Sequence, residues 1–133
     1  MLPTLSYHID LPLPQAEAAV RAALQPAGFG ILTEIDVQAT LKAKLDIDRP
    51  PYRILGACNP ALAHRALELA PDAGAFLPCG IALYPEAGGT RIAIQDPMLM
   101  ASQLGFPALE PIASEARDRI ATAIETIAVP SPA

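Results

Sequence analysis

The sequence has few of the residues and patterns that usually indicate a function. Tryptophan is absent from its 133 residues, tyrosine and phenylalanine occur three times each, and nine cations are scattered along a chain of formal net charge -5. A nucleic-acid-binding protein needs a cationic patch that displaces counterions from phosphates. We therefore expect no nucleic-acid partner. Proline and glycine break the uncharged runs well before the roughly 18 residues of a membrane span, so we also expect no membrane partner.

Cysteine is scarce as well, with Cys58 and Cys79 separated by 21 positions and no CxxC pattern. Residues 1–10 lack the basic segment and continuous apolar stretch of a signal peptide. We therefore expect a cytoplasmic protein, in which thiols stay reduced. A zinc site needs more ligands than two cysteines, and the simplest interpretation is two small buried side chains.

The usual catalytic motifs are missing. The chain contains no GxSxG, GxxxxGK[ST], GxGxxG or HExxH pattern, which excludes the nucleotide-binding and hydrolytic folds that these motifs define. Gly28-Phe29-Gly30 follows a predicted helix and precedes a predicted strand, which is the wrong order for a dinucleotide-binding loop.

Apolar residues are plentiful. They make up 52% of the chain, and the 17 leucines and 12 isoleucines are enough for one core beside 26 alanines. A chain of this length suits one domain. We expect a single α+β domain over residues 1–128, followed by a disordered tail at residues 129–133, which contains two prolines.

Alternation of apolar residues predicts five strands, at residues 4–10, 29–35, 52–58, 75–84 and 90–95. The turn at residues 85–89 predicts a hairpin between the last two. Pro78 lies inside the fourth predicted strand, and since proline cannot donate to a ladder it indicates an edge or a bulge there.

Helices are predicted at about residues 14–25, 37–45, 60–70, 97–104 and 108–128. Asp36 and Asn59 are suited to cap the second and third, because their side chains can accept the free N–H groups of a first helical turn. The last helix carries a long apolar stripe that includes Ile112, Ile120 and Ile124.

Polar residues at the ends of these elements are the candidates for a site. Glu34 shares a predicted strand face with Gly30 and Leu32, so its carboxylate must be solvated, paired or neutralised. It is either a surface carboxylate or a ligand or base. Cys58 precedes a helix start, where the helix dipole favours a thiolate; the alternative is a packed thiol.

The two cysteines become candidates for one shared site if the third and fourth predicted strands pair antiparallel. Cys58 and Cys79 would then approach each other, and together with His64 or Glu34 would hold a soft metal such as Cu(I) or Zn. Without a metal they would cycle between dithiol and disulfide. We place Lys42 and His64 as possible neighbours; alternatively, His64 and Glu68 form an exposed pair one helical turn apart.

Five segments together resemble one family. They are residues 28–37, Leu41-Lys42, residues 52–60, Leu77-Pro78-Cys79 and Asp96-Pro97. Together they are similar to the domain-of-unknown-function family numbered 302 (DUF302) over Tyr7 to Ile127. The resemblance implies a curved antiparallel sheet in a β-α-β4-α order with inserted helices, and a dimer, but no established reaction. The family pattern has asparagine after Leu-Pro-Cys where this chain has Gly80, so no role of that side chain carries over.

Three functions follow as hypotheses. The first is a homodimeric module that binds a small molecule or metal with Glu34, Lys42, Cys58, His64 and Cys79. The second is a thiol-based redox protein that uses Cys58 and Cys79. The third is a structural or interaction domain.

Overall fold

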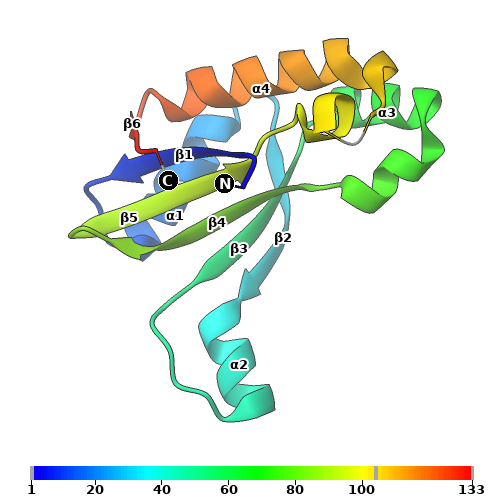
Figure 1. The fold of residues 1–133 in the computed structure, drawn as a ribbon. Helices are drawn as coiled ribbons and strands as arrows, with labels where there is room; N and C mark the ends of the chain where they lie inside the picture. Colours follow the sequence, from blue (N-terminus) through cyan, green and yellow to red (C-terminus); the bar gives the residue numbers. More distant parts are fainter. Residues whose placement is uncertain (1, 104, 133) are drawn as a thin grey trace.

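The structure is a computed structural model that describes residues 2–103 and 105–132 (Figure 1). In chain order its elements are β1 (Thr4–Ile9), α1 (Leu13–Leu24), β2 (Gly30–Asp36), α2 (Val37–Leu45), β3 (Arg53–Cys58), α3 (Pro60–Leu69), η1 (Pro71–Phe76), β4 (Cys79–Glu86), β5 (Gly89–Gln95), η2 (Leu99–Gln103), η3 (Pro107–Leu109), α4 (Glu110–Ile124) and β6 (Val129–Pro130). No helix of this described part is long and apolar enough to cross a membrane.

All strand pairs are antiparallel, and the described sheet has six strands in the order β2-β3-β4-β5-β1-β6. The expected antiparallel sheet and C-terminal helix are confirmed, but the expected number of five strands is wrong. Val129 and Pro130 pair with His8 and Tyr7 as β6, although we assigned them to a disordered tail. Pro130 is tolerated because an outermost strand needs no donor on its solvent side.

Two expected boundaries also move. β4 begins at Cys79 rather than at residue 75, because residues 71–76 form a 3-10 helix and the Leu77–Pro78 peptide bond is cis. The segment after Asp96 forms a short π-helix rather than an α-helix, with the Asp96 carboxylate accepting the Met98 N–H at 2.9 Å. The predicted caps of α2 and α3 are present, because Asp36 accepts from Ala39 and Asn59 from Leu62.

The strand register sorts side chains onto two faces. On one face the paired residues are buried and apolar, as in the series Leu55, Ile81 and Ile94, which crosses β3, β4 and β5. Buried residues of α1, α3 and α4, such as Val20, Leu62 and Ile120, join the same core cluster. The domain is thus a sheet with helices on one face, and α2, which has no buried residue, projects away from the rest of the fold (Figure 1).

Gly56 holds β2, β3 and the start of β4 in close contact on the other face. A Cβ atom at Gly56 would lie 2.2 Å from the Thr33 hydroxyl and 2.5 Å from the Pro78 ring. Both distances are far inside van der Waals contact, so this position admits only glycine without displacement of its neighbours.

We expect Gly56→Ala to lower the free energy of unfolding by about 1 to 3 kcal/mol, the usual cost of overpacking. Gly80→Ala is the matched control, because Gly80 pairs directly with Gly56 and a Cβ there meets no atom within 4 Å. Urea unfolding of both variants measures the difference. Equal losses in the two variants would contradict this account.

Candidate functional site

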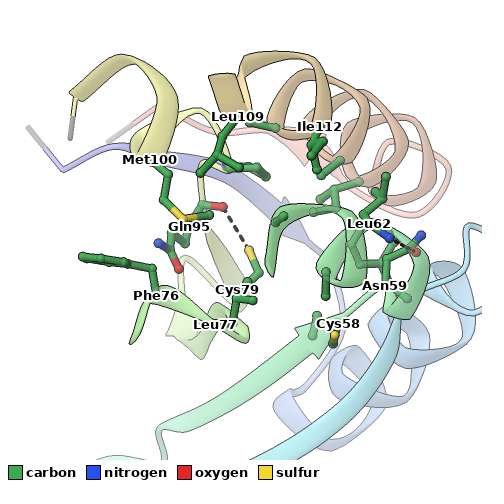
Figure 2. Close-up of a pocket in the computed structure, with 18 residues that line it drawn as sticks. Cys58, Asn59, Leu62, Phe76, Leu77, Cys79, Gln95, Met100, Leu109 and Ile112 are labelled. Carbon is green, nitrogen blue, oxygen red and sulfur yellow. Dashed lines mark hydrogen bonds between the residues drawn. The ribbon is translucent and has the colours of Figure 1, made fainter. Parts of the chain in front are cut away.

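The best-formed cavity of the described structure lies where α3 and α4 meet the ends of β3, β4 and β5 (Figure 2). Its volume is about 70 Å³, several times the roughly 10 to 15 Å³ that holds one water. Eighteen residues line it: Phe29, Ala57, Cys58, Asn59, Leu62, Ala63, Ala66, Phe76, Leu77, Cys79, Gln95, Pro97, Met100, Leu109, Ile112, Ala113, Ala116 and Ile120.

Alanines create this space. Five of the lining residues are alanine, and they come from β3, α3 and α4. Larger side chains, among them Phe76 and Met100, lie along one side of the cavity (Figure 2). A side chain that ends at Cβ leaves a gap where leucine would have filled the contact, so the cavity follows from the sequence at these positions.

Few polar groups reach the cavity, and two of them make hydrogen bonds beside it. The Cys79 thiol donates to the backbone carbonyl of Gln95 at 3.2 Å, and the Asn59 side chain accepts from the Leu62 N–H at 3.2 Å. Burial, together with the nearby Asp96 carboxylate, raises the pKa of Cys79 to about 12. This thiol is therefore protonated at neutral pH.

The strands that carry the two cysteines do pair antiparallel, as the metal hypothesis required. Cys79 lies directly opposite Ala57, however, so Cys58 is one residue further along β3. Successive strand residues point to opposite faces, and in Figure 2 the Cys79 sulfur points toward Gln95 while the Cys58 sulfur points out of the cavity. Burial also raises the pKa of Cys58, so no thiolate is favoured at this helix start.

The register argues against a direct bond between the two sulfur atoms. Side chains whose Cβ vectors diverge cannot close a disulfide without movement of the backbone, so the strand pairing gives no support to a disulfide or a shared metal ion between Cys58 and Cys79. Within residues 2–103 and 105–132, no group of three or more His, Cys, Asp or Glu side chains is arranged to hold a metal.

The two thiols differ in environment, and alkylation measures that difference. In Cys58→Ser the remaining Cys79 should react with iodoacetamide at pH 8 at least about tenfold more slowly than the remaining Cys58 of Cys79→Ser, because only the thiolate is a nucleophile. Raising the pH should accelerate Cys79, and unfolding in urea should make the two rates equal. Equal rates in the folded proteins would contradict the structure.

Glu34 lies apart from both cysteines, in an ion-pair network. It pairs with Leu55 across the sheet, and its carboxylate lies 2.5 Å from Arg21 and 3.6 Å from Arg53. Glu17 joins the same two arginines, at 2.9 Å from Arg53 and 3.0 Å from Arg21. Pairing is therefore how the carboxylate of Glu34 is tolerated, and the network ties α1 to β2 and β3.

Glu17 is the less exposed carboxylate of this network. Burial by itself would raise its pKa, but hydrogen bonds from Arg53 and Arg21 outweigh burial and lower the pKa. A carboxylate with a lowered folded-state pKa stabilises the fold above its unfolded-state pKa, and that contribution is lost as the pH falls.

Glu17→Gln should therefore cost about 1.5 to 3 kcal/mol of unfolding free energy at pH 7, the range for hydrogen bonds to charged groups. The difference from the parent should shrink between pH 7 and pH 3, because the contribution of the parent carboxylate is lost as it becomes protonated. Urea titrations at both pH values test this, with Glu68→Gln on exposed α3 as the control. A difference independent of pH would contradict the assignment.

Lys42 and His64 lie elsewhere. Lys42 sits on the projecting α2 and contacts Asp46 at 2.8 Å and Asp48 at 3.1 Å, which raise its pKa. His64 is exposed on α3, with Glu68 one turn away at 3.9 Å, as in the alternative interpretation. The structure thus does not gather the five predicted site residues; of these, only Cys58 and Cys79 line the cavity.

The sequence analysis does not place Phe76, Leu77, Gln95 and Met100 at a site. Phe76 lies in the 3-10 helix η1, where a strand is predicted, and Met100 lies in the π-helix η2, where an α-helix is predicted. The wall that α4 contributes is easier to predict, since Ile112 and Ile120 both belong to the predicted apolar stripe of the last helix. The alanine content of the helices was the available indication that helix and sheet would not close completely.

Two comparisons with known proteins point to the same family. A solved structure described as "uncharacterized conserved protein DUF302 from Bacillus stearothermophilus" is 28% identical in sequence, with a TM-score of 0.87 over 96% of this chain and 99% of that one. The pattern of the family described as "Domain of unknown function DUF302" matches residues 5–127. The chain belongs to the DUF302 family, as the sequence motifs indicated. No curated protein matches it.

Proposed function

We propose that this domain binds a small, uncharged, largely apolar molecule in the cavity between α3, α4 and the sheet. The observation that carries the proposal is the cavity itself: a hollow of about 70 Å³ with mostly apolar walls at the junction of several elements. Ligand sites are typically concave and apolar, with a few polar groups that fix orientation.

The lining argues against a charged ligand. None of its eighteen residues is Asp, Glu, Lys, Arg or His, and a charge that loses its water without a partner is costly. The two thiols are held protonated by burial, so they supply neither a nucleophile nor a charge. These features support binding rather than a reaction.

The other sequence-based hypotheses have less support. A metal held by Cys58 and Cys79, or a redox cycle between them, needs the two sulfur atoms close together, and the register that sets Cys79 opposite Ala57 argues against this. A homodimer remains part of the proposal, supported by a sheet face that stays partly exposed. A cytoplasmic location remains a prediction from the sequence.

Binding is tested with xenon and ethanol as neutral probes, which are small enough for a cavity of about 70 Å³. We expect both to shift the methyl NMR signals of Leu62, Leu109 and Ile112, whereas acetate should not. Ala66→Leu places a larger side chain in the cavity and should reduce the shifts at least about fivefold, since a filled cavity has no room for the probe.

Ala61→Leu is the matched control, because Ala61 is exposed on the same helix. Circular dichroism checks that both variants fold. Full binding by Ala66→Leu, or no shift with the parent protein, would overturn the proposed function.

A further inference from the structure

A second hollow lies on the face of the sheet that α1, α3 and α4 leave open. Its volume is about 500 Å³, and it opens to solvent. Its floor is made of small residues, because Ala82 and Ala93 pair directly across β4 and β5 and Gly80 adds no side chain. Larger side chains, among them Ile54 and Tyr84, stand beside this floor. The depression therefore follows from the sizes of neighbouring residues in the sheet.

Arg91 is the only charged residue among the described residues that line this hollow. It lies on the open face of β5, two positions from Ala93, yet its side chain is only 8% exposed. Its Nη1 atom donates to the Glu86 carboxylate at 3.3 Å and to the Ser131 hydroxyl at 3.4 Å. Both distances are long, since a charged nitrogen and a carboxylate oxygen usually approach to about 2.7 to 2.9 Å.

The guanidinium group of Arg91 keeps donors for a further acceptor. Within residues 2–103 and 105–132, its Nε and Nη2 atoms make no hydrogen bond to the protein. No fully buried side-chain nitrogen or oxygen in this part of the chain lacks a partner, so these two nitrogens keep contact with solvent. A largely buried cation is costly unless it is well paired. Its free donors therefore favour an anion that accepts from both nitrogens, as a carboxylate does.

The balance of charge favours an anion with a single negative charge. One guanidinium group, which Glu86 already shares, compensates no more than one charge, so a carboxylate fits this hollow better than a doubly charged phosphate. The stacked rings of Tyr52 and Tyr84, with centroids 5.3 Å apart, also line the hollow. Tyr84 pairs directly with Arg91 across the strands. Aromatic surface thus lies next to the free donors, where a flat ring packs favourably.

We propose that the open face of the sheet binds a small aromatic monocarboxylate. Its carboxylate accepts from Arg91, and its ring lies over Ala82 and Ala93 beside Tyr84. This second site goes beyond the proposed function and does not depend on it, because alternate residues of β5 point to opposite sides of the sheet and the cavity lies on the helical side. Every group that binds the ligand belongs to one chain, so the site is complete without a partner subunit.

Benzoate at pH 7 is the probe, and the backbone amide NMR signals of Ala82 and Ala93 report its binding. We expect saturable shifts. Benzamide, a neutral molecule of the same shape, should bind at least about tenfold more weakly, because it loses the charged hydrogen bonds to Arg91. Inorganic phosphate, which has no ring and more charge, should bind at least about tenfold more weakly as well. Absence of saturable benzoate shifts, or equal affinity for benzoate and benzamide, would overturn the proposal.

Variants test the two parts of the site separately. Arg91→Lys keeps the positive charge but loses the two-point fork, so it should lower the affinity for benzoate at least about fivefold. Arg65→Lys, on exposed α3, is the matched control and should bind as the parent does. Ala93→Leu fills the floor and leaves Arg91 in place, which gives a second test if Arg91→Lys does not fold. Circular dichroism checks the fold of each variant.

Parental affinity in a folded Arg91→Lys or Ala93→Leu protein would overturn the site. Ala66→Leu, which fills the cavity on the helical side, should leave benzoate binding unchanged. Conversely, Ala93→Leu should leave the xenon shifts at Leu62 and Ile112 unchanged. Failure of this site and failure of the proposed function are therefore distinguishable, because each has its own probe and its own blocking variant.

Discussion

One-sided burial of the antiparallel sheet is the constraint on which the rest of the structure depends. Strand residues alternate between faces, so once Leu55, Ile81 and Ile94 lie under the helices, the side of every other strand residue is fixed by the register. The positions of Cys58 and Cys79 follow from this, since Cys79 is opposite Ala57 rather than Cys58. A shift of one residue between β3 and β4 would reverse the result, and the buried leucines and isoleucines forbid that shift.

Local chemistry made much of the fold predictable. Asp36 and Asn59 are predictable as helix caps because a short side chain with an acceptor oxygen, placed just before a helix, can bond the free N–H groups of its first turn. The apolar stripe of α4 predicts that this helix packs on the core. What escaped prediction depends on distant partners. β6 is two residues long, and only the free edge of β1 makes it a strand. The late start of β4 depends on how residues 71–76 turn after α3, which periodicity does not encode.

The candidate site was less predictable, for a related reason. Glu34 was singled out because a carboxylate on an apolar face needs an explanation, and the explanation is Arg21 and Arg53, 13 and 19 positions away in sequence. Cys58 and Cys79 were paired through adjacent strands, which was right, but the face of each thiol depends on exact register. A cavity is harder still, because it is defined by what its lining does not fill. In the sequence, the alanine-rich faces of the predicted helices are what indicates the cavity.

An unfilled apolar cavity has an energetic consequence for the whole domain. At about 24 cal/mol per Å³, a cavity of about 70 Å³ lowers the stability of the fold by roughly 2 kcal/mol relative to a filled one. A molecule that occupies it restores the missing contacts, so binding and folding are linked, and the free energy of unfolding rises with the logarithm of the ligand concentration above the dissociation constant. The same β4 strand that carries Cys79 into this cavity presents Gly80 and Ala82 on the open face of the sheet. β4 therefore borders both the cavity and the open face, because alternate residues of one strand point to opposite sides.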